Sequence, residues 1–203
     1  MSTLTADEEF AIHQKLHGMY LPAGLGTEES ACSIAAINLA LSGRLTDEIP
    51  ACMSEVIGKW IIRVQDAMPA EMRNSDRWKN LLPLAAGTGR EHEQERLQII
   101  LNWMWGTVLP SLQPLADKQG FGETWRQMTE ERSAEAAMAE AAARAARAAA
   151  ATAAKAAEAA RAVAAEVAAA WAAEAAAEAA RVAAGWQKFD PCAVLDKLIE
   201  VGK

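Results

Sequence analysis

The chain has 203 residues, the length of one or two ordinary domains, and its formal net charge is −7. This acidic balance excludes a protein that is held to nucleic acid by bulk charge. The three cysteines lie far apart and are odd in number, which disfavours a disulfide framework and favours a reducing compartment. Charged residues interrupt the longest apolar segment, and no apolar stretch follows the acidic start. We therefore expect neither a membrane span nor a signal peptide.

Capping signals predict a series of helices along residues 1–133, and no segment shows the alternation typical of a strand. The predicted helices span about 6–17, 28–41, 46–68, 76–86 and 90–109, and a last one begins near residue 123. A capping box opens the first helix at Thr5, and Thr27 and Ser75 are expected to cap the second and the fourth. Pro83 is expected to end or kink the fourth helix. The fold class that follows is all-α.

Alanine dominates the next stretch, where it supplies 34 of the 51 residues from Ala134 to Ala184. Neither glycine nor proline interrupts this run, and alanine has the highest helix propensity, so one long helix is predicted. Charged side chains up to Glu166 gather on one face of this helix, and the larger apolar ones lie on the opposite face. A face of small residues lets another helix approach closely, so we expect a homo-oligomer with packed long helices. The alternative is a solvated helix without a partner.

These patterns divide the chain into a helical globular domain at 1–133, a long alanine-rich helix at 134–184 and a C-terminal docking helix at 185–203. Asp190, followed by a proline, is expected to cap the closing helix, whose apolar side chains dock on the globular domain or on a neighbouring copy. Large side chains in an otherwise small-residue segment are typical interface anchors. The candidate interface residues are Val163, Val167, Trp171 and Trp186.

The segment LAAGTGREHEQERL holds the most distinctive polar residues of the globular domain. A glycine-containing turn that opens a helix leaves main-chain N–H groups free, and the helix dipole adds positive potential, so an anion can bind there. The candidate ligand-binding residues are Thr88, Gly89, Arg90, His92 and Arg96. The segment contains no phosphate-loop pattern and follows no predicted strand, so it matches no known nucleotide motif. The alternative is a plain capping box from Thr88 to Glu91, with its charges in water.

Residues outside this segment give weaker signals. Asn38 in an apolar run and Arg44 after it are added to the candidate ligand-binding residues, although structural hydrogen bonding explains Asn38 equally well. His13 and His17 have a spacing compatible with zinc, but no third ligand accompanies them, so no metal site is predicted. No nucleophile stands in a recognisable arrangement with a base and an orienting group. We therefore predict no catalytic residue and no cofactor.

Four stretches of the sequence together carry a resemblance: ACSIAAINLALSGRLTDEIPACMS, NLLPLAAGTGREHE, the Ala/Arg/Glu run and FDPCAVLDKLIEV. Over nearly its whole length, the chain resembles a loose group of alanine-rich proteins met in phage and phage-like environmental sequences. The group has no established activity, so the resemblance implies no catalytic residues. It implies a setting, the cytoplasm of a bacterial host cell, where phage accessory proteins bind host factors or sequester signalling nucleotides.

The sequence therefore predicts a non-enzymatic binding protein, in one of two versions. In the first, a phage accessory or anti-defence protein captures a phosphate-bearing small molecule, such as a signalling nucleotide, as a homo-oligomer. In the second, an interaction or scaffold protein binds a host protein without a small-molecule ligand, and its alanine helix sets the geometry of assembly. A helical enzyme with an unrecognised site is a third class.

Overall fold

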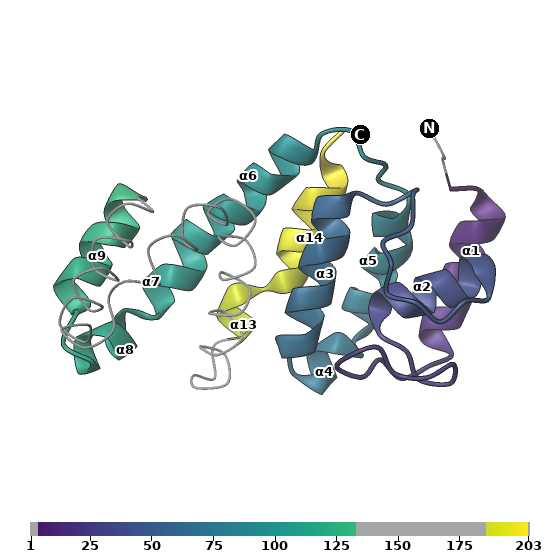
Figure 1. The fold of residues 1–203 in the computed structure, drawn as a ribbon, viewed down its shortest axis with the longest axis horizontal. Helices are drawn as coiled ribbons and strands as arrows, with labels where there is room; N and C mark the ends of the chain where they lie inside the picture. Colours follow the sequence, from purple (N-terminus) through teal and green to yellow (C-terminus); the bar gives the residue numbers. More distant parts are fainter. Residues whose placement is uncertain (1–3, 133–185, 203) are drawn as a thin grey trace, which may run out of the picture. The chain divides into compact units, whose positions relative to one another are not determined.

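The computed structural model describes residues 4–132 and 186–202, whose regular structure is helical (Figure 1). One isolated bridge between Gly26 and Ala31 is the only β-type pairing in this part of the chain, so the all-α prediction is confirmed for it. Contacts divide the chain after Ile100. The first unit holds the described residues up to Ile100 with 186–202, and the second unit holds 101–132. The predicted long helix lies outside the described residues, and no described helix is long and apolar enough to cross a bilayer.

The first unit contains most of the described helices, and three of its capped helices begin where the sequence predicts. Thr5, Ser75 and Asp190 each accept a hydrogen bond from a main-chain N–H three residues later. Pro83 lies inside its helix and does not end it. The helices are α1 (Ala6–His17), α2 (Ser33–Ser42), α3 (Glu55–Ala67), α4 (Ala70–Arg73), α5 (Asp76–Ala86), α13 (Trp186–Phe189) and α14 (Pro191–Glu200), and α6 (Glu93–Trp103) begins here.

Three predicted helix starts are wrong, because threonine side chains at those positions bind elsewhere. The hydroxyl of Thr27 donates to a nearby glutamate in a turn, and α2 begins later, with the Cys32 sulfur accepting from a main-chain N–H. The hydroxyl of Thr46 accepts from the N–H two residues on, and α3 begins only after Ser54. The third wrong start is that of α6, which begins at Glu93 instead of residue 90. Its predicted cap, Thr88, is described below with the predicted anion site. In each case a side chain that can cap forms a turn or tertiary contact instead.

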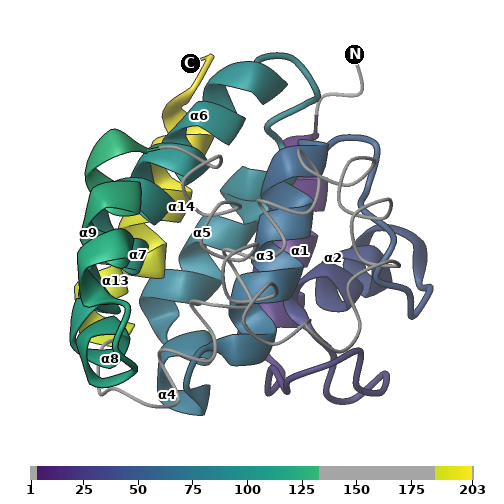
Figure 2. The same ribbon diagram turned by 60° about the vertical axis from the view of Figure 1, so that its left-hand side comes forward.

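Helix α5 is the central helix of the first unit. It packs against α1, α2 and α14, and it lies between α1 and α14 in both views (Figures 1 and 2). Its Trp78 is fully buried, and the ring centroid lies 6.2 Å from that of Trp60 in α3. The indole N–H of Trp78 donates to the hydroxyl of Ser33 in α2 (3.1 Å). Trp78 therefore joins three helices through one side chain.

The closing helix α14 completes the core of the first unit. It packs against α5 and α3, and the side chains predicted to dock are buried, namely Val194, Leu195, Leu198 and Ile199. At its start, Asp190 accepts from the N–H of Ala193 (3.1 Å) and pairs with Arg77 of α5 (2.9 Å). The last described helix therefore belongs to the same unit as the first.

Residues 18–32, here called the 18–32 loop, connect α1 and α2 in an irregular path. Leu21 is fully buried, and its carbonyl accepts from Arg73 (2.8 Å) and from Asn74 (3.1 Å). The ammonium group of Lys79, only 8% exposed, donates to the carbonyl of Met19 (2.9 Å). Side chains of α4, α5 and the turn between them therefore hold the backbone of this loop.

The second unit consists of short helical segments around a small apolar cluster. The end of α6 continues into a π-helical turn at Met104–Val108, then α7 (Leu109–Ser111), α8 (Gln113–Lys118) and α9 (Gly122–Glu131). Pro110 and Pro114, expected to break the chain, lie in the first turns of α7 and α8, where a missing N–H is tolerated. The cluster consists of Met104, Leu109 and Met128, with Leu101, Trp105, Leu112 and Trp125 packed against it.

Candidate functional site

Arg96, the central cation of the predicted anion site, is a buried structural residue. It is 1% exposed, and burial lowers the pKa of its guanidinium against the opposing effect of nearby glutamates. Its five N–H groups donate to the carbonyls of Leu198 (3.2 Å), Gly89 (3.1 Å), Glu91 (2.6 Å), Thr88 (3.0 Å) and Val201 (3.2 Å). A guanidinium has five donors, so none is left for a ligand. Arg96 fastens the turn before α6 to the end of α14.

Thr88 and Gly89 shape that turn, and the predicted capping box is wrong. The Thr88 hydroxyl donates to the carbonyl of Ala85 (2.7 Å) and accepts from the N–H of Ser54 (3.1 Å). Gly89 has a φ of 63°, and its N–H donates to the carbonyl of Cys52 (2.8 Å). Both residues therefore join the end of α5 to the segment before α3 instead of opening α6.

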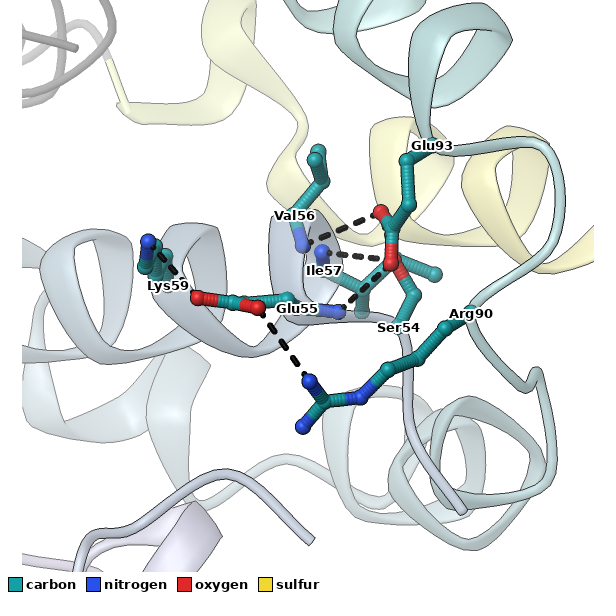
Figure 3. A network of polar contacts seen from close by, with 7 residues as sticks. All are labelled: Ser54, Glu55, Val56, Ile57, Lys59, Arg90 and Glu93. Carbon is teal, nitrogen blue, oxygen red and sulfur yellow. Dashed lines mark hydrogen bonds and ion pairs between the residues drawn. The ribbon is translucent and has the colours of Figure 1, made fainter. Parts of the chain in front are cut away.

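A carboxylate of the chain itself occupies a helix N-terminus in this region (Figure 3). One oxygen of Glu93 accepts from the N–H of Glu55 (2.8 Å). The other accepts from the N–H of Val56 (3.2 Å) and the hydroxyl of Ser54 (2.7 Å). The Ser54 hydroxyl in turn accepts from the N–H of Ile57 (3.2 Å). These groups satisfy the first donors of α3, so an outside anion would have to displace Glu93.

Glu55, Lys59 and Arg90 form a surface ion-pair group beside the same helix start (Figure 3). Lys59 Nζ lies 2.9 Å from one oxygen of Glu55, and Arg90 Nη1 lies 3.3 Å from the other. The hydrogen bond from Lys59 is the main reason that the pKa of Glu55 is lowered. Because all three side chains are roughly half exposed, these pairs stabilise the fold little. Arg90 is therefore the arginine of this segment that can turn toward a ligand at small cost.

The remaining candidates lie apart from this group. His92 Nδ1 lies 3.1 Å from a carboxylate oxygen of Glu95. Asn38 donates to the carbonyls of Thr46 and Glu48, both at 2.8 Å, and so holds the segment that follows α2. Arg44 is exposed, and within the described residues no hydrogen bond or ion pair joins it or Asn38 to residues 88–96. The contacts do not bring the sequence candidates together around one ligand.

The candidate interface residues fall into two groups. Val163, Val167 and Trp171 lie outside the described residues. Trp186 is only 6% exposed in the single chain, and its ring meets that of Phe189 edge to face, with centroids 5.8 Å apart. Trp186 therefore has little surface left for a second copy to cover.

Sequence reasoning missed an exposed apolar surface along α1 and α5. Phe10 is 64% exposed beside a shallow hollow of about 370 Å³, lined by Ala6, Glu9, Phe10, His13, Asn80 and Pro83. The signal was an aromatic residue on the polar face of an amphipathic helix. The His13 and His17 rings stack at 4.4 Å. Within the described residues, no group of three or more His, Cys, Asp or Glu side chains could hold a metal ion.

The three cysteine thiols are buried, and burial raises the pKa of Cys32, Cys52 and Cys192. We expect iodoacetamide to modify the native protein at pH 8 far more slowly than the urea-unfolded protein, because thiolate is the reactive form. The folded state keeps these protons above the unfolded pKa, so the free energy of unfolding should fall as pH rises past about 8.5. Alkylation followed by mass spectrometry, and urea unfolding at pH 7 and 9.5, measure both effects. Rapid labelling of a native thiol would contradict this expectation and indicate a nucleophile.

The polar candidates bind main-chain carbonyls or carboxylates of other parts of the chain. Arg96, Thr88 and Asn38 bind main-chain groups, and Arg90 and His92 pair with glutamates. The chain matches no protein-family model, no curated protein and no solved structure.

Proposed function

We propose that this chain is a non-enzymatic binding protein whose partner is another protein. The observation that supports this choice most is the internal use of Arg96, the cation on which phosphate binding would chiefly depend. All five of its donors bind carbonyl groups, and Glu93 already fills the start of α3. A phosphate at Arg96 would leave buried carbonyls unpaired, and such groups are costly. A protein partner requires none of these groups.

The proposal includes a setting and an assembly. The resemblance to alanine-rich phage-type proteins suggests an accessory, anti-defence role in the cytoplasm of a bacterial host, with a host protein as the partner. In this proposal, residues 134–184 set the geometry of a homo-oligomer through Val163, Val167 and Trp171. Trp186 serves folding of the single chain instead.

Native mass spectrometry of the full-length protein, compared with its denatured mass, tests this proposal. The protein is measured as purified and after incubation with a mixed pool of linear and cyclic nucleotides. We expect a whole multiple of the chain mass and no releasable small molecule. A phosphate-bearing species of a few hundred daltons would overturn the proposal in favour of small-molecule capture. A bare monomer would remove the assembly from the proposal.

Capture of a phosphate-bearing small molecule is the second candidate, and Arg90 is the observation in its favour. Its side chain is 49% exposed, and its ion pair with Glu55 at 3.3 Å is a surface contact. If a nucleotide binds here, Arg90→Ala should abolish binding in isothermal titration calorimetry and leave the fold intact. Arg63→Ala, at an exposed arginine of α3, is the matched control. Equal losses in both variants would indicate attraction by general charge instead of a site.

A further inference from the structure

The backbone of the 18–32 loop is fixed at successive residues by side chains from another part of the unit. The N–H and carbonyl of Leu21 both bind the Asn74 amide (2.8 and 3.1 Å), and Arg73 donates to the same carbonyl (2.8 Å). Lys79 holds the carbonyl of Met19 (2.9 Å). Further along, Gln65 donates to the carbonyl of Pro22 (3.3 Å), and Asp66 accepts from the N–H of Gly24 (2.8 Å).

The loop is also closed on itself beside its exposed residues. The Ser30 hydroxyl donates to the carbonyl of Tyr20 (3.2 Å), and the N–H of Cys32 donates to the carbonyl of Leu25 (3.0 Å). Gly26 has a φ of 80°, and a Cβ there would lie 2.0 Å from the Ser30 carbonyl oxygen. Substitution of this glycine would therefore open the turn. Hydrogen bonds within the loop therefore add to those from α4 and α5 in holding the backbone that carries Tyr20 and Leu25.

Large apolar side chains point outward from this fixed backbone. Tyr20 is 53% exposed and Leu25 is 42% exposed, whereas the intervening Leu21 is fully buried. Arg73 and Lys79 are 6% and 8% exposed, and burying a cation is unfavourable unless its hydrogen bonds are made. Here each cation donates one hydrogen bond to the loop, and Arg73 also donates to the carbonyls of Gln65 and Met68 at the end of α3. Long ordered loops on a rigid scaffold are typical places for recognition, and a pre-ordered tyrosine binds with little loss of conformational entropy.

The charge around the loop indicates the chemistry of the partner. Residues 18–50 carry four carboxylates, against a single cation at Arg44, and these carboxylates are Glu28, Glu29, Asp47 and Glu48. All four residues are exposed. Glu28 and Glu29 belong to the 18–32 loop itself, which carries no lysine or arginine, and exposed carboxylates in a loop with apolar anchors are complementary to a basic surface.

We infer that the 18–32 loop is the contact surface for a protein partner with a basic surface, with Tyr20 and Leu25 as its apolar anchors. This inference rests on the proposed function and names its surface and its class of partner. The hollow beside Phe10 is lined by residues of α1 and α5 and is not part of the inferred contact.

A library of random dodecapeptides displayed on phage, selected on the full-length protein, tests the inference. We expect the enriched peptides to combine lysine or arginine with apolar residues. Tyr20→Ala and Leu25→Ala should each weaken the best synthetic peptide about tenfold or more in calorimetry, as loss of a hot-spot residue does. Phe10→Ala removes an aromatic residue that is even more exposed, outside the loop, and should leave binding unchanged. Because Tyr20 and Leu25 are exposed, thermal unfolding of both variants should match the parent protein.

Three outcomes would contradict the inference in whole or in part. They differ in what they imply for the proposed function. Peptides that bind the Tyr20→Ala and Leu25→Ala variants as tightly as the parent would place the contact elsewhere and leave protein binding intact. Enrichment of peptides without basic residues would reject the partner's chemistry only. No enrichment at all, together with a releasable nucleotide in native mass spectrometry, would overturn the proposed function as well.

Discussion

Replacing Arg96 with methionine should lower the free energy of unfolding by about 3–5 kcal/mol, the range for breaking a buried, fully bonded charged group. Methionine keeps much of the volume of the side chain but leaves the five carbonyls without their donor. Two of these carbonyls, at Leu198 and Val201, belong to the C-terminal segment, so α14 should loosen first. Urea unfolding followed by circular dichroism measures the total loss, and hydrogen exchange of α14 locates it.

Arg90→Met is the matched control for the Arg96 variant, because it removes an arginine six residues away that pairs only at the surface. Its unfolding midpoint should stay close to that of the parent protein. Arg96→Lys should recover only part of the loss, since an ammonium has three donors for five carbonyls. Equal stability of the Arg96→Met and Arg90→Met variants would contradict a structural role for Arg96.

Replacing Trp78 with alanine should cost a similar amount, about 3–5 kcal/mol, as is usual when a large buried aromatic side chain is removed. The substitution leaves a cavity between α2, α3 and α5, and it removes the hydrogen bond to Ser33. Trp78→Phe should cost less, because the ring still fills most of the space. Thermal unfolding of both variants, with the exposed Phe10→Ala as control, checks the order of their effects. A Trp78→Ala protein as stable as the control would show that α5 is not the centre of the core.

The sequence predicts a helix well where the capping contact is local. Thr5, Ser75 and Asp190 bind N–H groups three residues away, so pattern and structure agree. At Thr27 and Thr88 the same residue type is used in other contacts. The Thr88 hydroxyl accepts from Ser54, 34 residues earlier in the chain, and no local pattern reveals such a competitor.

The candidate site shows even more clearly that a local sequence pattern does not reveal distant contacts. Sequence reasoning finds that residues 88–96 are unusual, and they do form a dense polar network. It assigns their donors to a ligand because the carbonyls that Arg96 binds lie up to 105 residues away. The Glu93 carboxylate reaches the start of α3 across a separation of 38 residues, so it also carries no readable signal. The chemistry of a residue is visible in the sequence, but its distant partner is not.

The return of the chain to the first unit has a consequence for its biosynthesis. Helix α14 is made after the helices that it covers, and the carbonyls it supplies to Arg96 emerge from the ribosome about a hundred residues after Arg96 itself. A nascent chain that ends near residue 132 therefore exposes the apolar sides of α3 and α5 that α14 later covers, and contacts of such long separation form slowly. Copies that end before α14 should therefore display uncovered core to chaperones and proteases.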